Sequence, residues 1–290
     1  MLSLFLSKKK NLTHTSIEIS RQYVRFVVLE EQTVGYVPVI FDEIVLAYNP
    51  PHNVIDLHTE HNGQDVQIMW DEIRDALDII TKKHVVESAH IVIPEMDMCG
   101  QEMCGVHNEQ CIKAIASYAH LIKEFGITPL SIQTESQAIT RVATDSLNLH
   151  ESVVLVSVGI YQTVVTLSKG GVPHMTKTIF HPRITDFTQE NKSAIRWRKD
   201  ISRMLFYVYE KEGARQQYFK KEIYMSGDIS REAIEQAKCF LEDAVGNAHL
   251  ETLPVWRHCF SLQRHIPIIH YQDMLRYANV IGGALTGVLK

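Results

Sequence analysis

The chain has 290 residues, of which 45% are hydrophobic and 22% charged, an ordinary composition for a globular protein with a large core. Its formal net charge of −5 gives no basic field of the kind that binds nucleic acid, so we expect no nucleic-acid partner. The five cysteines are an odd number in a long chain, which argues against a disulfide framework and favours a reducing compartment.

The N-terminus, MLSLFLSKKK, is briefly apolar and then basic. A signal peptide carries its charge first, and a transmembrane helix has about 20 apolar residues, so neither is expected. We predict that residues 1–12 form a flexible tail. A weak contact of its lysines with an anionic membrane surface is the alternative.

Strands and helices then follow one another in two similar blocks. Alternating apolar residues predict strands from residue 15 to residue 48, with separate runs at 34–40 and 44–48, and Pro50 and Pro51 end this region. The remaining elements predicted in the first block are a helix at 68–80, a strand at 89–93, a helix at 109–125 with Asn108 as its N-cap and Gly126 as its stop, a strand at 130–133, and a helix containing Ala138, Ile139, Val142 and Ala143. The apolar stripe of the 109–125 helix is expected at Ile112, Ile115, Ala116, Ala119 and Ile122.

The pattern restarts after residue 150. The predicted elements are strands at 153–158, 163–167 and 172–179, a helix at 192–211, a strand at 222–225, and helices at 234–245 and 277–289. Because this order repeats the first block, it predicts a duplicated architecture, although no sequence repeat is visible.

Two strand meanders that face each other across a cleft are typical of the actin-like ATPases. The stretches that carry a closer resemblance are SIEISRQYVRFVVLE, EFGITPLSIQTESQAITRV, VVLVSVGIYQTVVTLSKGGVPHMTKTI, EIYMSGD and YANVIGGALTGVL. In this order they resemble the PilM family of type IV pilus assembly proteins, relatives of the cell-division protein FtsA. The resemblance implies an α/β, ribonuclease H-like fold of two similar halves around a cleft. Residues 13–150, completed by 277–290, would form the first half, and residues 151–276 the second.

In that fold, hairpin backbone N–H groups surround the nucleotide phosphates, and glycines allow the close approach. By resemblance, the nucleotide cleft of this chain would contain Glu18, Ser20, Gly159 and Gly227. Ser20 stands where the family has a glycine, and Ser157 where it has an acid near Mg²⁺. Mg²⁺ prefers carboxylate and water oxygens, and Asp228 would be poorly placed beside a phosphate. We therefore expect a degenerate nucleotide site.

The family also inserts a small subdomain after the strand that ends near residue 93, and it uses a groove beside that subdomain to hold the N-terminal tail of the membrane protein PilN. Only residues 95–107 stand there in this chain. From position alone, the predicted partner contacts are Ser20, Arg21, Gln22, Tyr23, Met96 and Met98.

Two further clusters allow alternative interpretations. Cys99, Cys104, His107 and Cys111 form a Cys₃His set that fits a zinc knuckle chemically, but the spacing matches no standard module, and buried cysteines are the favoured interpretation. We therefore expect no metal. The basic run from Arg196 to Lys199 is interpreted as a solvated helix face around a buried Trp197, with a grip on an acidic partner as the alternative.

The resemblance implies a cytoplasmic scaffold at the inner face of the membrane. It would belong to a type IV pilus or related secretion platform and bind the N-terminal tail of a bitopic, PilN-like protein, with the pilus assembly ATPase as a further partner. We expect no enzymatic activity and no cofactor. The alternatives are an active ATPase that uses ATP with Mg²⁺ and an FtsA-like filament-forming protein.

Overall fold

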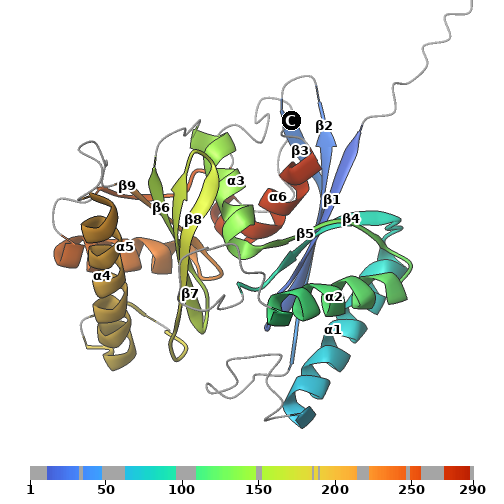
Figure 1. Ribbon diagram of the computed structural model, residues 1–290, viewed down its shortest axis with the longest axis horizontal. Coiled ribbons are helices and arrows are strands. Elements are labelled where there is room, and N and C mark those ends of the chain that lie inside the picture. Colours follow the sequence, from blue (N-terminus) through green and yellow to red (C-terminus); the bar gives the residue numbers. More distant parts are fainter. Residues whose placement is uncertain are drawn as a thin grey trace, which may run out of the picture.

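The computed structural model describes residues 12–32, 35–47, 63–95, 109–147, 152–184, 186–188, 190–213, 222–245, 249–255 and 271–287. Figure 1 shows two halves, each built on one sheet. Of the predicted tail at 1–12, residues 1–11 lie outside the described residues, as do Met96, Met98, Cys99, Cys104, His107 and Asn108.

The first half is built on a five-stranded sheet in the order β3-β2-β1-β4-β5. β1, β2 and β3 form an antiparallel meander, and β4 and β5 extend it in parallel with β1. The bounds of the strands are Thr13–Ile19, Tyr23–Glu31, Tyr36–Val45, Ser88–Ile93 and Thr128–Thr134, and those of helices α1 to α3 are Gly63–Lys83, Glu109–Glu124 and Glu135–Leu147.

The second half repeats this topology. Its sheet has the order β10-β9-β6-β7-β8, again an antiparallel meander of three strands followed by two parallel ones. The strand bounds are Val153–Val158, Gln162–Lys169, Val172–Phe180, Glu222–Gly227 and His249–Thr252, and helices α4 and α5 span Lys192–Gly213 and Arg231–Val245. The duplicated architecture predicted from the order of elements is therefore confirmed.

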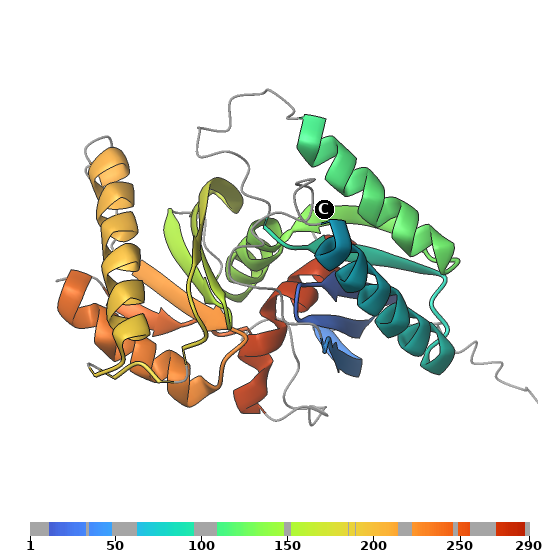
Figure 2. The same cartoon turned by 90° about the horizontal axis from the view of Figure 1, so that it is seen from below.

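The C-terminal segment lies between the two sheets. It consists of a 3₁₀ helix η2 (Tyr271–Tyr277), the helix α6 (Ala278–Ala284) and a 3₁₀ turn η3 (Leu285–Gly287), so the single helix predicted at 277–289 is shorter than expected. α6 packs against α3, β1, β2 and β4, as Figure 2 shows from below. A Cβ at Gly282 would lie 2.1 Å from the Ala138 carbonyl oxygen, and one at Gly283 would lie 2.1 Å from Ser16 Oγ. This close packing requires glycine at both positions.

Two local predictions were wrong. The runs at 34–40 and 44–48 form one strand, because the ladder with β2 continues through Phe41, Asp42 and Glu43. The expected stripe of α2 was misplaced except at Ile122, which is buried as predicted: Ile112 and Ile115 are exposed, and α2 buries Ala114, Tyr118 and Leu121 instead. Tyr118 packs against Trp70 of α1, with ring centroids 5.1 Å apart, and burial of this large ring sets the helix rotation.

Each half has its own hydrophobic cluster. α1 and α2 cover one face of the first sheet, with Ile73, Leu77 and Tyr118 among the buried residues. The second cluster includes Trp197 of α4 and reaches across to Val27 of β2 and to α6, so it joins the halves. None of the helices among the described residues is both long and apolar enough to span a bilayer.

Candidate functional site

The first hairpin turn satisfies its own backbone donors. The Ser20 amide donates to the Tyr23 carbonyl at 2.9 Å, and Ser20 Oγ accepts hydrogen bonds from the amides of Gln22 and Tyr23, each at 3.1 Å. In a phosphate-binding hairpin such amides point at the ligand. In this turn two of these amides, those of Gln22 and Tyr23, donate to the Ser20 hydroxyl instead.

The second hairpin turn uses its glycine for close packing. The Gly159 amide donates to the Gln162 carbonyl at 2.7 Å, and a Cβ at Gly159 would lie 2.8 Å from that oxygen. A Cβ at Gly227, at the end of β9, would lie 2.0 Å from the Val158 carbonyl oxygen, which also accepts a hydrogen bond from the Asp228 amide at 3.0 Å. Both glycines are therefore required by the packing of the second half, whether or not a ligand is bound.

A buried arginine joins the two halves between these turns. Arg25 of β2 is fully buried, and its guanidinium forms an ion pair with Asp228, which follows β9. The same group pairs with Glu43 of β3, with 2.5 Å between Nε and Oε2, and lies 3.7 Å from Glu18 Oε2. It also donates to the Arg276 carbonyl, and Arg276 in turn pairs with Glu43 at 2.9 Å. One guanidinium thus contacts three carboxylates from both halves; we call these four residues the Arg25 cluster.

Aromatic rings enclose this guanidinium. Arg25 Cζ lies 3.5 Å from the centroid of the Tyr23 ring and 5.0 Å from that of Tyr277. Burial alone would lower the pKa of Arg25, but Asp228, the Tyr23 hydroxyl, Glu18 and Glu43 together raise it well above its ordinary value. The guanidinium is therefore a permanent buried cation, whose charge favours ionised carboxylates around it.

Glu18 is the carboxylate most deeply buried in the cluster. The Tyr23 hydroxyl is 3.3 Å from its Oε1, and Asn279 Nδ2 of α6 donates to the same oxygen at 3.1 Å. Burial raises the pKa of Glu18 to about 7; Arg25 acts against this shift and Asp228 adds to it. Glu18 therefore exchanges a proton near neutral pH.

A second buried acid, Glu135, lies at the start of α3. Gln162 of the second hairpin approaches it, with 3.4 Å between Nε2 and Oε2. Burial, followed by the charges of Glu18, Glu95 and Asp228, raises the pKa of Glu135 well above its usual value. Glu135 was not among the predicted site residues. The run TESQ indicates that a helix starts here, since Gln137 Oε1 accepts from the Thr134 amide at 3.0 Å as in one half of a capping box, but it gives no sign that Glu135 is buried.

The structure brings the predicted nucleotide-cleft residues into one region. Glu18 and Ser20 belong to the first turn, and the Tyr23 hydroxyl donates across the halves to Asp228 at 2.5 Å, next to Gly227 and the Gly159 turn. Asp228, predicted to disfavour a phosphate, is instead the second half's contribution to the Arg25 cluster.

The predicted partner contacts differ in exposure. Ser20 and Tyr23 are 8% and 4% exposed, so they offer little surface to a partner, whereas Arg21 and Gln22 are half-buried. The Arg21 guanidinium lies 5.5 Å from the ring centroid of Phe180, a further contact between the halves. Within the described part of the chain, no three His, Cys, Asp or Glu residues are grouped as metal ligands would be.

A scan against protein-family models found no match, and neither did a search among curated sequences. Solved structures do match. One is a chain of the PilM–PilN type IV pilus biogenesis complex, with a TM-score of 0.55 and 13% identity, covering 97% of this chain and 99% of that chain. Another is the ethanolamine utilization protein EutJ from Carboxydothermus hydrogenoformans, with a TM-score of 0.51 and 13% identity, covering 94% and 89%. The chain has the actin-like ATPase fold. At this identity the similarity establishes the fold alone.

Proposed function

We propose that this actin-like protein is a cytoplasmic, non-enzymatic scaffold at the inner face of the membrane. It would serve a type IV pilus or related secretion platform, bind the N-terminal tail of a bitopic, PilN-like protein, act beside the pilus assembly ATPase, and use no cofactor. The observation that carries the proposal is the Arg25 cluster, which joins the halves through the protein's own charges. The similarity in fold to a chain of the PilM–PilN complex supports the pilus assignment.

A nucleotide bound between the hairpin turns would have to displace contacts that the protein already makes. Mg²⁺ bound with ATP takes oxygen ligands from carboxylates, and the phosphates take N–H donors. Glu18 and Asp228 already face Arg25, and the amides of Gln22 and Tyr23 already bond Ser20 Oγ. A buried carboxylate pair that loses its cation is destabilised by about 3–5 kcal/mol. A nucleotide would have to offset that cost before it gained any affinity.

The first experiment is thermal unfolding with and without millimolar Mg-ATP. A ligand at 100 times its Kd stabilises a protein by about 2.7 kcal/mol, which moves Tm by several degrees. We expect no shift for this protein. A Mg²⁺-dependent rise in Tm would contradict the cofactor-free scaffold.

The second experiment concerns the partner. A fluorescent peptide with the cytoplasmic N-terminal tail of a PilN protein should bind saturably in an anisotropy titration, and a scrambled peptide should not. We expect Gln22→Ala or Arg21→Ala to weaken binding if the first turn is part of the contact. Equal binding of both peptides would overturn the scaffold assignment.

A second candidate function is the ATPase, and the observation that favours it is Glu135. A buried carboxyl group with a raised pKa near two hairpin turns is the kind of group that acts as a general base. The test is phosphate release from Mg-ATP by the wild type and by Glu135→Gln. ATPase activity that disappears in Glu135→Gln would replace the scaffold proposal with this one.

A further inference from the structure

Helix α4 carries a basic stripe along its outer face. The exposed residues follow a helical spacing of three and four, and they are Lys192, Arg196, Lys199, Arg203, Phe206 and Tyr207. Residues at this spacing lie on one face of an α-helix. The four cations span about 16 Å of helix and end beside two aromatic side chains. We call this set the α4 stripe.

The opposite face of α4 attaches the helix rigidly to the second half. Trp197, Ile201, Leu205 and Val208 are all fully buried, and Trp197 Nε1 donates to Thr163 Oγ1 of β7 at 2.8 Å. Asn191 caps the helix start by accepting from the amides of Ser193 and Ala194. The stripe is thus presented on a fixed helix, and its buried face confirms the sequence interpretation of Trp197.

Among the α4 side chains that the structure describes, one carboxylate lies beside the stripe. The side chains of Arg196 and Arg203 are each 80% exposed, and each lies 3.9 Å from the same carboxylate, Asp200. Such exposed pairs contribute little energy, and one carboxylate cannot neutralise four cations. On a chain whose net charge is −5, this is a concentrated positive surface.

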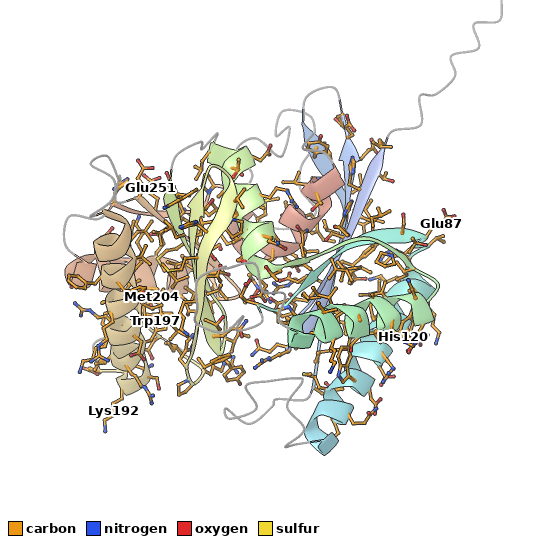
Figure 3. The ribbon with its side chains drawn as sticks, viewed as in Figure 1. Glu87, His120, Lys192, Trp197, Met204 and Glu251 are labelled. Atoms are coloured by element: carbon orange, nitrogen blue, oxygen red, sulfur yellow. The ribbon has the colours of Figure 1, made fainter. Side chains whose placement is uncertain are left out.

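Two aromatic side chains extend the stripe at its C-terminal end. Phe206 is 63% exposed and Tyr207 43% exposed. Figures 1 and 2 place α4 on the outside of the second half, on the side away from the first, and in Figure 3 Lys192 projects from one end of this helix. The surface offered is therefore the convex side of one helix at the edge of the molecule.

We propose that the α4 stripe docks on an anionic lipid surface. Clustered lysines and arginines complement anionic headgroups, and exposed Phe and Tyr favour the interfacial region. An acidic peptide is the other ligand of complementary charge. The convex side of a single helix suits a planar surface better than a peptide, because peptides are held in grooves or along strand edges. The proposal does not depend on the scaffold function, since it concerns a different surface from the cleft.

The test is co-sedimentation of the full chain with vesicles of pure phosphatidylcholine and with vesicles containing 30% phosphatidylserine, at low and high salt. Each basic residue strengthens binding to an anionic leaflet by about fivefold. We expect binding only to the anionic vesicles, weakened by salt, and reduced about a hundredfold in the triple variant Arg196→Gln, Lys199→Gln, Arg203→Gln. Phe206→Ser should weaken it by a smaller factor.

The matched control removes three exposed lysines from the first half, Lys82→Gln, Lys113→Gln and Lys123→Gln, and so changes the net charge equally. The control should bind as the wild type does. Failure of the wild type to bind anionic vesicles would overturn the proposal, and so would equal binding by the α4 variant, which would assign binding to another segment such as the N-terminal lysines. Binding of a polyglutamate peptide without vesicle binding would assign the α4 stripe to an acidic protein instead.

Discussion

The two hairpins at the centre of the molecule share a turn hydrogen bond but differ in the charge of the residues beside the turn. In each, the first residue of the turn donates its amide to the carbonyl of the fourth, Ser20 to Tyr23 and Gly159 to Gln162. In the strands on either side of each turn, Glu18 of β1 pairs with Arg25 of β2 in the first half, and Ser157 of β6 pairs with Val164 of β7 at the equivalent place in the second. The two halves therefore have the same turn hydrogen bond, and only the first half has charged residues at the paired positions beside it.

The difference shows how the halves are joined. The first half carries a buried cation between two acids of its own, and the second half supplies one further acid, Asp228. An ion pair between the two halves stabilises their contact only while both charged residues are present. The equivalent position in the second half, Val164, is buried and carries no charge, and it pairs with Ser157 within its own sheet.

Removal of the central cation should have the largest effect. Arg25→Ala leaves three carboxylates without their shared partner, and we expect the free energy of unfolding to fall by about 3–5 kcal/mol. Val164→Ala, the equivalent change in the second half, should cost about 1–3 kcal/mol through lost packing. Urea denaturation of both variants provides the comparison. A cost for Arg25→Ala no larger than that for Val164→Ala would mean that the Arg25 cluster does not join the halves.

The next effect concerns pH. Because the pKa of Glu18 is about 7 in the folded protein and about 4.5 when unfolded, the folded state binds more protons between these values, and stability falls as pH rises through this window. The contribution of Glu18 to stability should drop by about 3 kcal/mol from pH 4.5 to above 7. The difference in free energy of unfolding between the wild type and Glu18→Gln measures this drop.

Ser157→Ala, at the equivalent place in the second half, is the control for that measurement. It removes no titratable group, so its difference from the wild type should be constant with pH. A constant difference for Glu18→Gln as well would show that Glu18 stays ionised throughout, held by Arg25.

The smallest loss of stability is expected from a change in the first hairpin turn. Ser20→Ala removes the acceptor for two backbone amides, and we expect a loss of about 1–2 kcal/mol in the free energy of unfolding. Ser20→Thr keeps the hydroxyl and should recover most of it. Thermal unfolding of the two variants is sufficient. Equal stability of wild type and Ser20→Ala would mean that the Gln22 and Tyr23 amides find other acceptors.

Much of the fold was predictable because the local spacing of apolar residues indicates where strands and helices form. The alternation in β6, β7 and β8 and the stop at Gly126 gave boundaries within two residues of those observed. The rotation of α2 was not predictable, because it depends on the contact of Tyr118 with Trp70 from another helix.

The candidate site was predictable only in part. Glu18, Ser20, Gly159 and Gly227 came from a resemblance, whereas Arg25 reads as one polar residue in a strand. Its partners Asp228 and Arg276 lie more than 200 residues further along the chain, a separation at which local sequence carries no signal. Glu135 reads as an ordinary helix-start acid until the structure shows its burial.

The position of α6 constrains the order in which the protein can be built. The last helix of the chain packs against β1, β2 and β4, and Asn279 within it bonds Glu18. At a synthesis rate of about 5–20 residues per second, the first half waits roughly 7–26 s between the emergence of α3 and that of α6. During that interval the part of the sheet that α6 covers is not yet packed, and neither Gly283, which packs against Ser16, nor Asn279, which bonds Glu18, has been made. The first half to be made is therefore the last to be completed, and a ribosome that stops before residue 278 releases a chain with an open sheet.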